Sequence, residues 1–202
     1  MTLDLIFSII FLIFSVIIHE VSHGYAASML GDETARAAGR LTLNPLKHLD
    51  PVGSVIVPIL TYFAGFVIGW AKPVPVNPYN LRGKYAEPIV AFAGPLSNII
   101  VALFFGLLIR FGSNTLPESF IHMSALLVLI NIVLALFNLV PIPPLDGSKI
   151  LFGFLPYRFQ YLRQNLERFG FFLVLIFVFF LWQYVAPIVN VIFGLITGFS
   201  LM

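Results

Sequence analysis

The sequence contains no cysteine and few charged residues. The absence of cysteine excludes disulfide bonds, thiolate metal sites and cysteine nucleophiles. Only 10% of the 202 residues are Asp, Glu, Lys or Arg, against about 25% in an average soluble domain. The formal net charge is +2 and the basic residues form no tract, so we expect no nucleic-acid partner.

Hydrophobic residues dominate what remains. They make up 59% of the chain, and the mean hydropathy is +1.00. Several apolar runs reach or approach the roughly 20 residues with which a helix crosses about 30 Å of hydrocarbon. The prolines and glycines between them do not fit the alternation of a β-barrel. We therefore predict an all-α polytopic membrane protein of the cell membrane, with residues 1–202 as a single domain.

Four of these runs are predicted to span the lipid bilayer as helices. They cover residues 5–30, 88–110, 120–140 and 170–199, with a break in the last run near Pro187. The second run is expected to open at "AGPLSN". Because the first run lacks the basic segment of a signal peptide, we expect it to be retained.

Two connecting segments are less regular than the spans. The alternating stretch "RAAGRLTLN" at 36–44 predicts a short β hairpin at the membrane surface. Residues 52–70 are apolar but are interrupted by glycine and proline. This second segment either re-enters the membrane and returns or crosses it as a fifth span.

The stretch "HEVSH" at 19–23 places ionisable groups inside the first apolar run, where charged residues are costly and usually functional. On a helix, His19 and His23 project from one face, one turn apart. With Glu20 they form a His-Glu-x-x-His motif, in which the imidazoles bind zinc and the glutamate is the general base. The alternative is two core histidines beside an unrelated glutamate.

A catalytic zinc usually has a third protein ligand. Asp146 is favoured because it follows the rigid "PIPP" and precedes Gly147 after a spanning helix. Two neutral imidazoles, this carboxylate, Glu20 and Zn²⁺ also sum to zero charge, which costs least to bury. Alternatively, Asp146 is the N-cap of the next helix. The remaining candidates are His48, Asp50, Glu87 and His122. Of these, His48 and Asp50 are expected to be ordinary loop residues.

The distribution of basic residues predicts the orientation. If residues 52–70 return to the side from which they enter, ten of the eleven Lys and Arg residues lie on one side and Arg110 on the other. A full crossing gives seven against four. The positive-inside rule therefore favours re-entry, an external N-terminus and a metal site nearer the cytoplasmic face.

Three motifs resemble the site-2 protease family of intramembrane zinc metalloproteases (peptidase M50). They are "HEVSH" at 19–23, "AGPLSN" at 93–98 and "NLVPIPPLDGSKIL" at 138–151, in the order of the family. The chain is similar to a minimal prokaryotic branch that lacks PDZ and CBS domains. The resemblance implies an endopeptidase that hydrolyses peptide bonds within or next to transmembrane segments of membrane proteins.

The resemblance also implies roles for individual residues. His19, His23 and Asp146 are the expected ligands of one Zn²⁺ per chain, and Glu20 is the base. Asn138 is expected to hold the oxyanion or the substrate backbone, the alternative being a hydrogen bond at a helix end.

Other questions stay open at this point. We expect a strand edge within 36–44 to receive the extended substrate. The roles of His48 and Asn98, and the oligomeric state, are undecided. Two other functions are possible: a metal transporter or sensor, which usually needs several metal stations along its path, and a non-enzymatic scaffold, which has no use for zinc.

Overall fold

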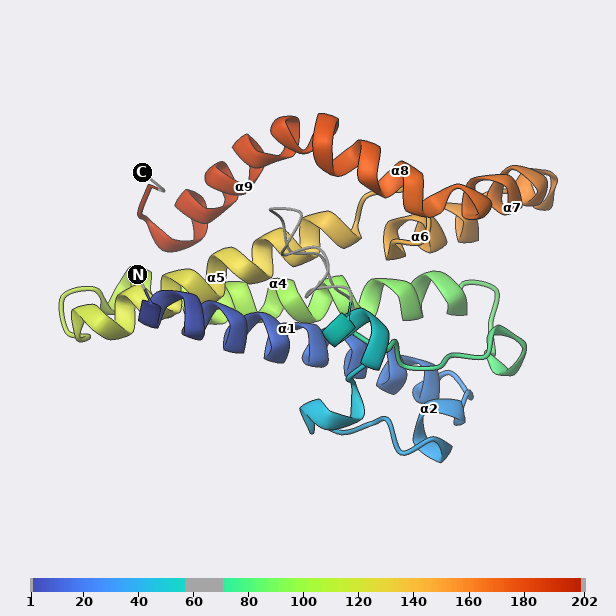
Figure 1. Cartoon of the computed structure of the whole chain (residues 1–202), viewed down its shortest axis with the longest axis horizontal. Helices are drawn as coiled ribbons and strands as arrows, with labels where there is room; N and C mark the ends of the chain where they lie inside the picture. The colour runs from blue at the N-terminus through green and yellow to red at the C-terminus, as the bar shows by residue number, and fades with distance from the viewer. Residues whose placement is uncertain (1, 57–70, 201–202) are drawn as a thin grey trace.

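The computed structural model describes residues 2–56 and 71–200, and within these ranges all regular structure is helical (Figure 1). Four of the described helices are long and apolar enough to cross a membrane: α1 (Thr2–Met29), α4 (Ala86–Gly112), α5 (Glu118–Asn138) and the continuous run Gly170–Thr197. They correspond to the four predicted spans. The expectation of a helical membrane protein is therefore confirmed.

The shorter elements connect these helices. They are α2 (Thr34–Ala37), η1 (Pro45–Lys47), η2 (Pro51–Ile56), η3 (Pro78–Asn80), α6 (Asp146–Phe154), η4 (Tyr157–Phe159) and α7 (Gln160–Arg168). The last long run consists of α8 (Gly170–Ile176), η5 (Phe177–Leu181) and α9 (Trp182–Thr197).

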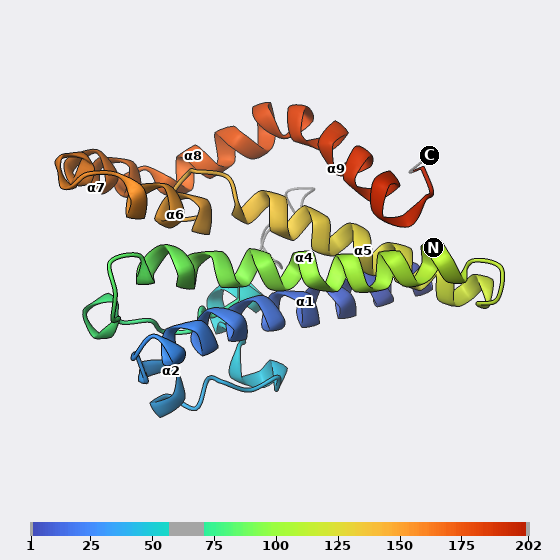
Figure 2. The same cartoon turned by 180° about the vertical axis from the view of Figure 1, so that it is seen from behind.

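Helix α4 lies at the centre of the bundle. It packs against α1, α5, α6 and α9, and α1 also contacts α5. A buried cluster joins α4, α5 and α9 through Ala102, Val128, Ile132, Val189 and Phe193. Many large apolar side chains on the outer faces are exposed, as expected of surfaces that meet lipid tails. Figures 1 and 2 show α8 and α9 arching over α5.

The two ends of the bundle differ. Both termini and the turn between α4 and α5 lie at one end in both views (Figures 1 and 2). The other end carries α2, α6, α7 and the turn into α4. Helix α1 ends there at Met29, and Gly31 just beyond it has a φ of 102°, a left-handed conformation that glycine adopts without strain.

The predicted β hairpin at 36–44 is wrong. The backbone N–H of Arg40 donates to Ala35 O and that of Gly39 to Arg36 O, at 3.0 and 2.9 Å, with φ of 62° at Gly39. This is a glycine-terminated helix end, so these amides are used within α2 and its cap. No strand occurs in 2–56 or 71–200.

Three further boundaries can be compared with the sequence analysis. The second span begins at Ala86, so "AGPLSN" lies inside α4 rather than at its start. In the last span the α-helix is interrupted by the π-helical turn η5, while Pro187 lies within α9. The choice between re-entry and crossing depends on residues 57–70, which lie outside the described residues. Described residues before and after this segment are in contact, since Lys72 N–H donates to His48 O at 2.9 Å.

Candidate metal centre

Three predicted ligands come together in the structure. The His19 and His23 rings meet edge to face with centroids 4.7 Å apart, and their Nε2 atoms are 3.1 Å apart. Asp146 Oδ2 lies 3.1 Å from each of these nitrogens. All three residues are buried, at 6 to 8% exposure. In the part of the chain that the structure describes, this is the one group of His, Asp or Glu side chains placed to hold a metal ion.

The loop after α5 brings Asp146 to the histidines. Asp146 is the first residue of α6, and the N-cap position belongs to Leu145, so the capping role considered from the sequence is wrong. At Gly147 a Cβ would lie 2.2 Å from Leu139 O. Only glycine therefore allows the loop to fold back this closely on the end of α5. Lys149 Nζ lies 3.4 Å from Asp146 Oδ1, the carboxylate oxygen that does not face the histidines.

The Nδ1 atoms of both imidazole rings form hydrogen bonds. His23 Nδ1 donates to Val90 O and His19 Nδ1 donates to Asn98 Oδ1, each at 2.7 Å. A carbonyl oxygen only accepts, so in a neutral imidazole the Nδ1 proton leaves a lone pair on Nε2. Two imidazole lone pairs and a carboxylate oxygen thus converge, which is the donor set that suits zinc.

Gly94 of α4 leaves room for an ion beside the histidines. A Cβ at this position would lie 2.4 Å from His23 Nε2 and 2.6 Å from His19 Nε2. Gly94 was identified from the sequence only as part of a motif, and no role at the site was predicted for it. Its spacing of one helical turn from Asn98 was the available signal, since residues four apart share a helix face.

Glu20 is half-buried beside the first ligand. Its Oε2 accepts a hydrogen bond from the backbone N–H of Val74 at 2.8 Å. Val74 belongs to the irregular segment 71–77, for which no role at the site was predicted from the sequence. The segment therefore fixes one oxygen of the predicted base.

Asn138 ends α5, and its Nδ2 donates to Leu134 O at 2.9 Å. This contact is the helix-end hydrogen bond considered as the alternative from the sequence. A role for Asn138 in holding the oxyanion or the substrate stays a prediction.

The other acidic and histidine candidates lie elsewhere. The ring of His48 bonds Thr42 O, Asp50 accepts from the N–H groups of Val52 and Gly53, Glu87 pairs with Arg163, and His122 pairs with Asp4. The expectation that His48 and Asp50 do not belong to the site agrees with this placement.

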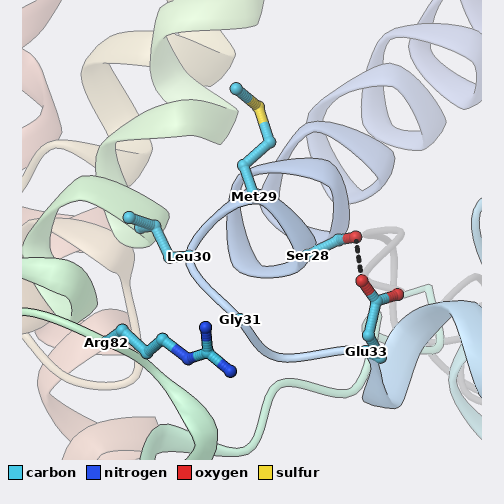
Figure 3. Close-up of a pocket in the computed structure, with 6 residues that line it drawn as sticks. All are labelled: Ser28, Met29, Leu30, Gly31, Glu33 and Arg82. Atoms are coloured by element: carbon cyan, nitrogen blue, oxygen red, sulfur yellow. Dashed lines mark hydrogen bonds between the residues drawn. The ribbon is translucent and has the colours of Figure 1, made fainter.

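A cavity of about 370 Å³ opens where α1 ends (Figure 3). Ser28, Met29, Leu30, Gly31, Glu33 and Arg82 line it. The Ser28 hydroxyl donates to Glu33 at 3.0 Å, as Figure 3 shows. None of the candidate ligands is among its lining residues, so the metal centre is a separate feature.

Comparisons with known proteins agree with the three motifs. The model of peptidase family M50 matches residues 108–181. YwhC of Bacillus subtilis (strain 168), which carries the provisional name zinc metalloprotease, is 40% identical over 192 residues, covering 90% of this chain and 85% of YwhC. Rip2 of Mycolicibacterium smegmatis, with the same provisional name, is 30% identical over 162 residues, or 80% of this chain and 62% of Rip2.

A more distant relative is zinc metalloprotease MJ0392 of Methanocaldococcus jannaschii. It is 28% identical over 156 residues, which cover 77% of this chain and 36% of MJ0392. No solved structure matches the chain. The likeness to YwhC along most of both chains confirms the resemblance inferred from the motifs: this protein belongs to peptidase family M50.

Proposed function

We propose that the protein is a zinc-dependent intramembrane endopeptidase of the site-2 type. Its substrates are transmembrane proteins, cut within or next to their membrane-spanning segments. The observation that carries the proposal is the convergence of Asp146 with His19 and His23, which lie with Glu20 on α1, a helix long enough to span a bilayer. Relatives named zinc metalloproteases support the same chemistry.

The roles of the residues follow from their placement. His19 and His23 would bind zinc through Nε2 and Asp146 through Oδ2. Zinc, when bound, acts as a Lewis acid that polarises the peptide carbonyl and activates a water molecule. Glu20 would accept a proton from the attacking water and return it to the leaving amine nitrogen. The Val74 N–H would hold Glu20 in position while this proton moves.

The position of the site along α1 supports catalysis near one membrane face. With a rise of 1.5 Å per residue, His23 and His19 lie about 9 and 15 Å from Met29, where α1 ends. The segments next to the end of α1, the start of α4 and the end of α5 (32–49, 71–85 and 147–169) contain ten of the eleven Lys and Arg residues, whereas Arg110 lies in the last turn of α4. By the positive-inside rule, this end is cytoplasmic. The protein would then cross the cell membrane several times with an external N-terminus.

A transporter or sensor would need a different arrangement. Permeation of an ion requires successive binding stations, whereas residues 2–56 and 71–200 contain a single group suited to a metal. The buried ligands and the adjacent, oriented glutamate favour catalysis.

The decisive variant is Glu20→Gln. It keeps the size of the side chain and an acceptor oxygen for Val74 but removes the base. We expect zinc content to stay at the wild-type level while cleavage of a transmembrane substrate in detergent or liposomes falls at least about 100-fold. Glu118→Gln, the same change at an exposed glutamate on α5, should leave cleavage unchanged. Wild-type turnover by Glu20→Gln would exclude the proposed base.

A further inference from the structure

A chain of buried polar side chains runs from His19 into α5. His19 Nδ1 donates to Asn98 Oδ1, and Asn98 Nδ2 donates to Asn131 Oδ1 at 2.8 Å. Asn131 Nδ2 donates to Ser15 Oγ and to Leu127 O, each at 2.9 Å. The two amides are 0% exposed and Ser15 is 2% exposed. The chain therefore joins α1, α4 and α5 in a region without access to water.

The direction of every hydrogen bond is fixed from one end. Leu127 O is a backbone carbonyl and can only accept, so the NH₂ group of Asn131 must face it. The oxygen of Asn131 then faces α4 and requires the NH₂ group of Asn98. Ser15 O, 3.4 Å from the same Asn98 nitrogen, makes the same demand.

This direction ends at the metal ligand. Since the Asn98 nitrogen points to Asn131, the Asn98 oxygen points to His19 and can only accept the Nδ1 proton. The Nε2 atom of His19 is then left with a lone pair, which a zinc ligand requires. If Asn98 were free to rotate by 180°, its NH₂ group would face Nδ1 and favour the opposite tautomer, with a proton on Nε2.

The two histidines differ in this respect. His23 Nδ1 is fixed directly by Val90 O, because a backbone carbonyl cannot reverse its polarity. His19 is fixed by a side-chain amide, which can be reversed unless other groups hold it. The hydrogen-bonded series Ser15, Asn131 and Asn98, which we call the relay, gives His19 a hydrogen-bond acceptor of fixed orientation, as Val90 O does for His23.

We propose that Asn131 and Ser15 are positioning residues for His19, acting through Asn98 to hold its ring in the tautomer that binds zinc. This inference rests on the ligand roles given under Proposed function. It assigns a function to two residues of α1 and α5 that lie outside the sequence motifs of the site.

The main test is Asn131→Leu, which replaces the amide by an apolar side chain of similar size and so removes the relay. We expect purified protein to bind Zn²⁺ about 10-fold more weakly in competition with a chelator, at the lower end of outer-sphere effects. Val128→Ala is the control, since Val128 is buried on the same helix but outside the relay. It should lower thermal stability while the Zn²⁺ affinity stays within about twofold of wild type.

A tautomer measurement separates positioning from packing. The chain has four histidines, so ring-¹⁵N labelling with single substitutions assigns His19. The measurement uses zinc-free Asp146→Ala protein, which lacks the carboxylate that faces His19 Nε2 at 3.1 Å. At a pH well above the ordinary imidazole pKa, protein with the intact relay should show Nδ1–H, and the added Asn131→Leu change should give a mixture with Nε2–H. If Asn131→Leu does not fold, Ser15→Ala takes its place, with a smaller change in the same direction.

The outcomes distinguish the two proposals. A wild-type protein that binds no Zn²⁺ would overturn the metal site itself. A wild-type protein that binds Zn²⁺, together with relay variants of unchanged affinity and tautomer, would overturn only the relay. Equal loss of affinity in Val128→Ala and Asn131→Leu would also overturn it, because packing would then explain the effect.

Discussion

At the residue scale, the candidate metal centre depends on the absence of a side chain at Gly94. The three predicted ligands offer the donor atoms, but α4 passes so close that any Cβ at Gly94 would clash with both Nε2 atoms. Side chains four apart on α1 could be predicted from the sequence because helix geometry fixes them. Asp146 could be predicted because charge balance restricts the third ligand. Val74 and Asn131 could not, because their contacts depend on how separate elements pack.

The role of Gly94 leads to a prediction at the residue scale. Gly94→Ala should reduce Zn²⁺ affinity at least about 10-fold, since the new methyl group displaces the imidazoles or the ion. Gly106→Ala makes the same change on the same helix, where the methyl group would meet the Ile196 side chain. It should affect stability but not metal binding. Metal analysis after dialysis measures both; equal zinc content in Gly94→Ala and wild type would contradict the assignment.

At the scale of elements, the segment 71–80 is tied to α1 and to the loop after it. Val74 bonds Glu20, and the Arg40 guanidinium donates to Lys72 O at 2.7 Å. Asp32, which is 0% exposed, accepts from Asn77 N–H at 2.7 Å and from Asn80 Nδ2 at 3.0 Å. The sequence identified the motif helices but gave no signal for these cross-links, because each joins residues 32 or more positions apart.

Asp32 provides a prediction about this segment. Asp32→Asn replaces one acceptor oxygen by NH₂ and leaves a buried donor without its partner, so the protein should lose about 1 to 3 kcal/mol of stability. Thermal unfolding in detergent measures the loss. Glu33→Gln is the control, because the Glu33 side chain is about half exposed and should shift the midpoint little. An unchanged midpoint in Asp32→Asn would show that the cross-link does not stabilise the segment.

Acid should have the same effect as this substitution. Burial works to raise the pKa of the Asp32 carboxyl, but hydrogen bonds from Thr34, Asn80 and backbone N–H groups hold it below the ordinary 3.8. A carboxyl whose pKa is lower in the folded state than in the unfolded state stabilises the protein at pH values above the unfolded-state pKa. This contribution should be lost as the pH falls through the lower folded-state pKa, and Asp32→Asn should show a smaller loss on acidification than wild type.

The hairpin error belongs to the same scale. The pattern at 36–44 alternates as a strand would, yet Gly39 and the residues before it form a helix end. Local alternation cannot decide between these structures when a glycine able to adopt positive φ follows four residues with helical propensity. The four long helices were predictable because long, predominantly apolar runs leave few other structures in a bilayer.

At the scale of the whole molecule, the orientation in the membrane is the main prediction. The absence of cysteine makes any introduced thiol unique. Lys84→Cys lies just before α4 and Asn114→Cys in the turn before α5, and both positions are exposed. A membrane-impermeant thiol reagent should label Asn114→Cys on intact cells and Lys84→Cys only after the membrane is opened. Labelling of Lys84→Cys on intact cells would show that the orientation is the opposite of the predicted one.

The central claim is that His19, His23 and Asp146 hold one zinc ion inside the bundle. X-ray absorption at the zinc edge of the purified protein tests it most directly. We predict one zinc per chain with two imidazole ligands and carboxylate oxygen at about 2.0 to 2.2 Å, and loss of this oxygen ligand with weaker binding in Asp146→Ala. A zinc environment unchanged by Asp146→Ala, or one without imidazole, would contradict the account.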